Sequence, residues 1–262
     1  VNTLAFSPDS RVLASGAGST IMLWDAASGQ PIGEPLQAHT DEIWEIAFSP
    51  DGQMLASAGE DETIILWDVA SRQPIGEPLR AHNDIVFSVA FAPDGQMLAS
   101  AGADNLVYLW DVATRQTTGE PLRGHTNWVF SVVFDPTGQL VATGSADNTV
   151  RFWDINTRQA LGEPLRGHER WVRSVRFSPD GQMLLSGSED NTLILWDVPS
   201  RRRIDAPLAV HQDKVWSVAF HPSGEQFASA SNDGSVLYWS TAPYSILGSS
   251  FDTTVQTDQV LS

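Results

Sequence analysis

The stretch that decides the fold is Ile43–Asp68, IWEIAFSPDGQMLASAGEDETIILWD. It opens with an apolar run, Ile43–Phe48, which stops at Ser-Pro-Asp-Gly, a typical turn sequence, and this pattern predicts a first strand. Two further strands are predicted at Met54–Ala58 and at Thr63–Trp67, the latter rich in β-branched residues. The next segment, Arg72–Leu79, contains two prolines, and because proline lacks an N–H we expect it only at a sheet edge. The unit therefore predicts a four-stranded antiparallel sheet.

This unit recurs along the chain with a period of 43 residues. Three residue types keep the period independently: tryptophan at Trp24, Trp67, Trp110, Trp153, Trp196 and Trp239; histidine at His39, His82, His125, His168 and His211; and aspartate at Asp61, Asp104, Asp147, Asp190 and Asp233. Inner strands that are apolar on both faces need a neighbour on each side, which sheets stacked around an axis provide. We therefore predict an all-β fold, a β-propeller of four-stranded antiparallel blades with six repeats.

Three short motifs point to a known family: Leu-Trp-Asp at Leu66–Asp68, Gly-His at Gly124–His125 and Phe-Ser-Pro-Asp-Gly at Phe48–Gly52. In six registered copies they resemble the WD-repeat family over residues 1 to about 240. The resemblance implies a hydrogen-bonded Asp-His-Ser/Thr-Trp network in five repeats, which would rigidify each blade because its buried polar atoms are satisfied. The implied sets are Asp61, His39, Ser57 and Trp67; Asp104, His82, Ser100 and Trp110; Asp147, His125, Thr143 and Trp153; Asp190, His168, Ser186 and Trp196; and Asp233, His211, Ser229 and Trp239.

The first and last repeats depart from the pattern. The first has Trp24 and Ser15 but is one residue short and lacks the turn aspartate, and no histidine precedes it. We expect a single propeller domain over residues 1–262, a piece of a longer chain, with blades at approximately 1–38, 43–81, 86–124, 129–167, 172–210 and 215–262. The last blade would take its outer strand from Tyr244–Val260, within which Phe251–Val255 is the candidate. The family more often has seven blades, so a seven-bladed parent remains an alternative to six.

Composition excludes several classes of function. The absence of cysteine excludes disulfides, thiolate zinc sites and cysteine nucleophiles, and fits a cytoplasmic location. A net charge of -17 repels a phosphate backbone, so no nucleic-acid partner is expected. No run approaches the roughly 18 apolar residues of a membrane span, and no membrane association is expected. No cofactor is predicted.

Catalysis and metal binding find few candidate residues. Five of the six histidines belong to the implied networks, and each repeated aspartate lies in a turn of a separate blade. We therefore predict no catalytic residue, no metal ligand and no enzyme activity. A hydrolytic propeller remains an open alternative, and its expected sign would be a polar cluster at the ring centre that breaks the repeat. The sequence shows no clear cluster of that kind.

Four tryptophans lie outside the repeated framework and suggest a binding face. The resemblance implies that three sets of positions face the rim of the central channel: Thr3, Trp44, Phe87, Phe130, Arg173 and Trp216; Glu42, Ile85, Trp128, Trp171 and Lys214; and Glu60, Ala103, Ala146, Glu189 and Asn232. Aromatic side chains arranged around the channel mouth, with carboxylates beside them, predict a clamp for an extended peptide that carries Arg or Lys. In the alternative interpretation these aromatics only plug the channel mouth.

Arg170, Arg173 and Arg176 add a positive sector beside this face, which either receives an acidic partner segment or pairs with neighbouring carboxylates. The near-identical repeats with recurring Gly-Glu-Pro-Leu are similar to propeller arrays of large prokaryotic signalling proteins, such as switch ATPases and Ser/Thr kinases. We therefore expect a scaffold or sensor domain that binds protein or peptide partners beside other domains of a parent chain. A structural spacer without a ligand and a nucleic-acid platform stay open.

Overall fold

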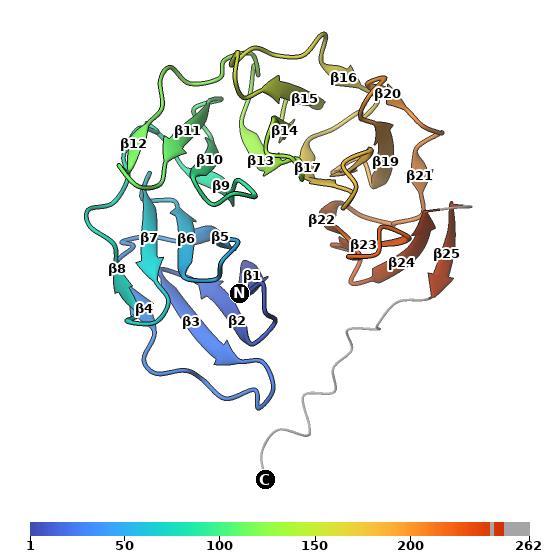
Figure 1. Ribbon diagram of the computed structural model, residues 1–262. Helices are drawn as coiled ribbons and strands as arrows, with labels where there is room; N and C mark the ends of the chain where they lie inside the picture. The colour runs from blue at the N-terminus through green and yellow to red at the C-terminus, as the bar shows by residue number, and fades with distance from the viewer. Residues whose placement is uncertain (242–243, 249–262) are drawn as a thin grey trace.

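Six antiparallel sheets make up the part of the chain that the computed structural model describes, residues 1–241 and 244–248. Every helix or strand assigned in these ranges is a β-strand. Figure 1 shows the sheets arranged around a common centre, with the first strand of each sheet innermost. The predicted all-β propeller with six repeats is confirmed.

The first three strands of each blade are four to six residues long and follow one another in sequence order from the ring centre outward. The inner strands are β1 (Thr3–Phe6), β5 (Ile43–Phe48), β9 (Val86–Phe91), β13 (Val129–Phe134), β17 (Val172–Phe177) and β22 (Val215–Phe220). The second strands are β2 (Val12–Ala17), β6 (Met54–Gly59), β10 (Met97–Gly102), β14 (Leu140–Ser145), β18 (Met183–Ser188) and β23 (Gln226–Ser231). The third strands are β3 (Thr20–Asp25), β7 (Ile64–Asp68), β11 (Val107–Asp111), β15 (Thr149–Asp154), β19 (Thr192–Asp197) and β24 (Val236–Thr241).

The outer edge is shorter than the sequence predicts. Its strands are β4 (Leu36–Gln37), β8 (Gln73–Pro74), β12 (Gln116–Thr117), β16 (Leu165–Arg166), β20 (Arg202–Arg203), β21 (Leu208–Ala209) and β25 (Tyr244–Gly248). In the second blade the predicted strand Arg72–Leu79 is interrupted: β8 pairs with β7, and Leu79 pairs separately with Ile64. The interruption follows from Gly76, whose φ is 67°, and from Pro78, which has no N–H to donate.

The outer strand of the last blade is β25, paired antiparallel with β24. It lies within the predicted range Tyr244–Val260. The narrower candidate, Phe251–Val255, falls outside the residues that the structure describes.

Neighbouring blades are held together by apolar clusters at five junctions. At the first junction Ile21, Leu23 and Leu36 of the first blade pack against Ile43 and Ile46 of the second, and all five are buried. Equivalent clusters fill the four junctions that follow. Each fully buried aliphatic side chain contributes about 1.5–3 kcal/mol, so these junctions set the rigidity of the disc.

At each end of the arc, side chains whose equivalents are buried between blades are uncovered. Leu4, which stands in register with the buried Ile46, is 61% exposed. At the other end Tyr238, in register with the 5% exposed Leu195, is 44% exposed. Figure 1 shows the corresponding opening of the ring between the β1–β4 blade and the β22–β25 blade.

Candidate functional site

A buried chain of hydrogen bonds ties the loop before the inner strand to the sheet in five blades. In the second blade His39 Nδ1 lies 2.9 Å from the Asp61 carboxylate, and His39 Nε2 lies 2.7 Å from the Ser57 hydroxyl. The Trp67 indole N–H donates to the same hydroxyl at 2.9 Å. The same contacts recur among Asp104, His82, Ser100 and Trp110; Asp147, His125, Thr143 and Trp153; Asp190, His168, Ser186 and Trp196; and Asp233, His211, Ser229 and Trp239.

The chemistry of these groups fixes the direction of each hydrogen bond. The Trp67 N–H can only donate, so the Ser57 hydroxyl accepts it and gives its own hydrogen to His39 Nε2, while His39 Nδ1–H donates to Asp61. Burial alone would raise the pKa of Asp61, but hydrogen bonds from His39 and other nearby donors hold it well below its usual range, and the same holds in the fourth to sixth blades. Burial lowers the pKa of His125, which favours the neutral ring.

The order Asp, His, Ser in these networks is that of a serine hydrolase triad, yet the surroundings differ. The Ser57 and Ser100 hydroxyls belong to residues with no exposed surface, and each already accepts an indole N–H. A nucleophile must be able to reach a substrate carbonyl, and hydroxyls with no exposed surface cannot do so. The networks therefore serve the framework of each blade.

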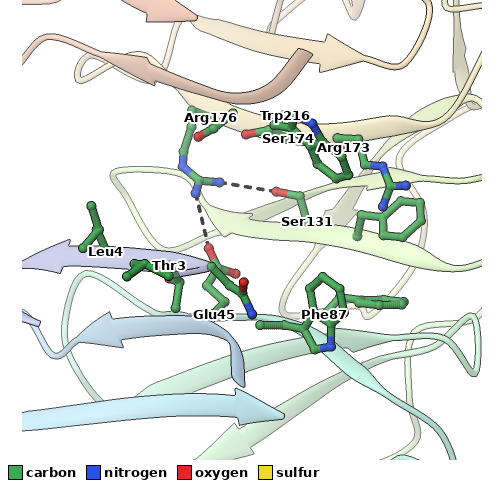
Figure 2. Close-up of a pocket in the computed structure, with 14 residues that line it drawn as sticks. Thr3, Leu4, Glu45, Phe87, Ser131, Arg173, Ser174, Arg176 and Trp216 are labelled. Atoms are coloured by element: carbon green, nitrogen blue, oxygen red, sulfur yellow. Dashed lines mark hydrogen bonds and ion pairs between the residues drawn. The ribbon is translucent and has the colours of Figure 1, made fainter. Parts of the chain in front are cut away.

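The channel-rim residues come from an irregularity at the start of each inner strand. In blades two to six the pairing with the second strand skips one residue there, forming a β-bulge that redirects its side chain. The skipped residues are Trp44, Phe87, Phe130, Arg173 and Trp216, and all of them line one cavity of about 640 Å³ at the ring centre. Figure 2 shows Phe87, Arg173 and Trp216 around this cavity.

The first blade has a different residue in this position. Because Leu4 pairs with Ser15 as Ile46 pairs with Ser57, the residue in register with Trp44 is Asn2 rather than Thr3. The predicted rim position at Thr3 is therefore wrong by one residue, since the sequence alignment overlooked the shorter first repeat. Both residues still line the cavity.

Aromatic side chains form a continuous surface across the second to fifth blades. Ring centroids lie 5.6 Å apart for Trp44 and Phe87, 5.0 Å for Phe87 and Phe130, and 5.8 Å for Trp128 and Trp171. Trp128 is 39% exposed and Trp216 is 44% exposed, whereas Phe130 is 8% exposed. The surface thus combines rings that plug the channel mouth with rings that face solvent.

The charged residues predicted on this rim are largely paired with each other. Arg173 donates from Nε and Nη2 to Glu189 Oε1 at 2.8 and 2.5 Å, and Lys214 Nζ lies 3.4 Å from Glu189 Oε2. Glu42 accepts a hydrogen bond from the Asn2 amide at 2.8 Å, and Glu60 is half-buried. The carboxylates expected to receive a partner's cation are thus mostly occupied.

Arg173 also covers three of the aromatic rings that a partner's cation could contact. Its guanidinium carbon lies 3.9 Å from the ring centroid of Phe130, 4.7 Å from that of Trp216 and 4.9 Å from that of Trp171. Of the predicted positive sector, Arg173 and Arg176 form ion pairs with carboxylates and Arg170 stays exposed. The simpler alternative, internal pairing, therefore describes two of the three arginines.

The sequence analysis missed one polar pair at the ring centre. Arg176 Nη2, from the fifth blade, lies 3.3 Å from Glu45 Oε1 of the second blade across the cavity (Figure 2). Both residues break the repeat. Glu45 stands in the column of Thr3, Ser88, Ser131, Ser174 and Ser217, and Arg176 stands in the column of Ala5, Ala47, Ala90, Val133 and Ala219. Comparing the equivalent positions of the six repeats would have found both residues, so the expectation of no clear polar cluster at the ring centre overlooked this pair.

This pair carries no sign of a complete catalytic or metal centre. Glu45 is held by several donors, and no histidine lines the cavity that the described residues form. Within residues 1–241 and 244–248, no three His, Asp or Glu side chains gather where they could hold a metal ion. The same part of the chain contains no helix of the length and apolarity that crossing a membrane requires.

Comparisons with known proteins agree with this architecture. The family described as WD domain, G-beta repeat matches residues 1–25, 29–68, 72–111, 115–154, 159–197 and 205–240. Among similar proteins, the human intraflagellar transport protein 122 homolog is 34% identical over 62 residues, and coronin-7 of Pongo abelii is 41% identical over 63 residues. Each alignment covers 24% of this chain, but 5% and 7% of those two relatives. The chain thus matches only a small part of the length of these proteins.

Proposed function

Because the chain belongs to the WD-domain, G-beta repeat family, whose repeats generally mediate protein–protein interaction, we propose that it holds a protein or peptide partner on its channel-rim face. The observation that carries this proposal is the continuous aromatic surface at the channel mouth. Trp128 and Trp216 expose large indole surfaces there, and exposed tryptophan is typical of the residues that dominate protein interfaces. The buried networks and junction clusters hold the blades that carry these side chains, and a rigid binding surface loses less entropy on binding.

The proposal extends to the protein in which this domain acts. We propose that it is the recruitment or sensing module of a multidomain signalling protein and acts in the cytoplasm. The recurring Gly-Glu-Pro-Leu and the absence of cysteine support this, and so do the lengths of the matched relatives, of which this chain covers a small part. The relatives named above are eukaryotic, so a prokaryotic parent is supported by the sequence resemblance alone.

The extent of the domain belongs to the same proposal. We propose one propeller unit over residues 1–262, within which the six sheets act as a single platform. The continuous series of five apolar junctions supports this reading.

A pull-down from lysate of the source cells tests the binding face. The bait is compared with a Trp128→Ser, Trp216→Ser variant and with a matched control, Tyr238→Ser, whose aromatic side chain is as exposed as Trp216 but lies on the uncovered face of the last blade. The proposal expects partners to be lost with the double variant and kept with the control. Equal recovery with both variants, each checked for folding by circular dichroism, would overturn it.

A further inference from the structure

Hydroxyl side chains at the channel link each blade to the next, and one blade has an acid in their place. Thr3, Ser88, Ser131 and Ser174 each accept the backbone N–H of the following blade at 3.0 to 3.3 Å. Glu45 makes the same link to Val89 N–H at 3.0 Å through Oε2, and it also accepts the Ser88 hydroxyl. Serine or threonine makes this link to the next blade at the other positions, so the link alone does not account for the second carboxylate oxygen of Glu45.

The second oxygen of Glu45 positions Arg176. Glu45 Oε1 accepts from Arg176 Nη2 at 3.3 Å, while Arg176 Nη1 donates to the Val175 carbonyl at 2.8 Å and contacts the Ser131 hydroxyl at 3.3 Å. These contacts hold one edge of the guanidinium at the cavity wall. An arginine restrained in this way is preorganised, so it loses less entropy when it binds a further group.

Two N–H donors of the Arg176 guanidinium are still available. Three of its five N–H groups are used in the contacts above, and within the described residues no acceptor lies on Nε or on the second Nη2 hydrogen. The Nε and Nη2 donors share one side of the planar group, which is the edge that Arg173 uses to hold Glu189. Such an edge matches a carboxylate in a two-point hydrogen-bonded pair.

Charge at the cavity favours an anion over a cation. Two cationic side chains, Arg173 and Arg176, and one carboxylate, Glu45, line the cavity, in a protein whose net charge is -17. Arg173 already covers three of the rings that would attract a cation, Phe130, Trp171 and Trp216. A local positive excess inside an acidic protein attracts an anionic group and gives its approach a direction.

We propose that the central cavity binds a carboxylate of the partner polypeptide, held by the free edge of Arg176, with Glu45 and Ser131 as positioning residues. The inference rests on the proposed function and favours an acidic partner segment over the peptide carrying Arg or Lys, both of which the sequence suggests. Arg176 lies three residues below the rim residue Arg173, a depth of about 10 Å along a strand. The partner must therefore insert backbone, and either its C-terminal carboxylate or an Asp or Glu side chain supplies the same chemistry.

Small probes of known composition test this site directly. We would titrate the protein with acetyl-Gly-Gly bearing a free C-terminal carboxylate, with the same peptide as its amide, with acetyl-glutamate methylamide and with inorganic phosphate, following the indole N–H resonances by NMR. The expected result is binding of at least one carboxylate probe at least about tenfold more tightly than the amide. The first and third probes distinguish a chain terminus from a side chain. Equal binding of the amide, or binding of phosphate without either carboxylate, would overturn the inference.

The repeats themselves supply matched variants. Arg176→Ala and Glu45→Ser introduce residues that other blades carry at these positions, so the double variant restores the repeat and is expected to fold. Carboxylate binding should be lost in Arg176→Ala and in the double variant, and weakened without being lost in Glu45→Ser, where Arg176 keeps its charge but loses the contact that positions it. Unchanged binding in Arg176→Ala contradicts the site. If no carboxylate binds while Trp128→Ser, Trp216→Ser still loses its partner, the carboxylate inference fails and the proposed function stands.

Discussion

The buried networks make a quantitative prediction in the third blade. The Ser100 hydroxyl accepts the Trp110 indole N–H at 2.9 Å and donates to His82 Nε2 at 2.8 Å, and all three residues are buried. Ser100→Ala leaves both the Trp110 indole N–H and His82 Nε2 without a hydrogen-bond partner. A buried polar group left without a partner costs about 1–3 kcal/mol, so the free energy of unfolding should fall by about 2–6 kcal/mol.

The first blade provides the control for this change. Ser15 accepts only one such bond, from the half-buried Trp24 at 2.8 Å, and that blade has no histidine. Water can reach part of Trp24, so Ser15→Ala should cost about 1 kcal/mol. Both variants remove the same hydroxyl from the same strand position, and they differ in what the hydroxyl holds.

Urea denaturation followed by tryptophan fluorescence measures both costs. The midpoint should move several-fold further for Ser100→Ala than for Ser15→Ala, with the slope unchanged. Hydrogen exchange would place the extra loss in β9–β11. Equal shifts for the two variants, or a cost below about 1 kcal/mol for Ser100→Ala, would refute the argument that the network stabilises the blade.

Three further outcomes follow from the same contacts. Stability should fall with acid in two steps. The pKa of His125 is lowered in the folded protein, so its neutral ring contributes stability that is fully present above the ordinary pKa of 6.5 and is lost as the pH falls below it. The pKa values of the network aspartates are also lowered, so their carboxylates contribute stability that is present above the ordinary pKa of 3.8 and is lost as the pH falls further. A flat unfolding midpoint from pH 7 to 3 would contradict this. Arg173→Ala leaves the buried Glu189 carboxylate with Lys214 alone and should cost about 3 kcal/mol by denaturation, and adding Glu189→Gln should recover part of it, so no recovery would speak against the ion pair. Hydrogen exchange should show weaker protection in the first and last blades than in the middle ones, because their outward faces are uncovered, and uniform protection would refute this.

Periodicity was sufficient to predict the fold. Trp67 and its equivalents recur every 43 residues, and this spacing gave the number of blades and the order of the strands. The broken outer edge was not predicted in full. The prolines of Arg72–Leu79 indicated an edge, but the gap between β8 and Leu79 depends on the backbone at Gly76, whose positive φ no periodicity reveals.

The candidate site was predicted in position, but the charge of its ligand was left open between two alternatives. The rim positions followed from the repeat, and Trp44 and Phe87 do line the cavity. The pairing of Arg173 with Glu189, and of Arg176 with Glu45, depends on which side chains meet across the ring. Residues 131 positions apart in the chain come together only when the blades are closed into an arc, so the sequence could not show this contact.

Site-specific photo-crosslinking tests the central claim most directly. A p-benzoyl-phenylalanine in place of Trp128 sits on the channel-rim face, whereas one in place of the exposed Asp180 sits in the turn at the opposite end of the β17 strand. Binding on the rim predicts that irradiation links the partner to position 128 and leaves position 180 unlinked. Linkage at position 180 with none at position 128 would contradict a partner held on the channel-rim face.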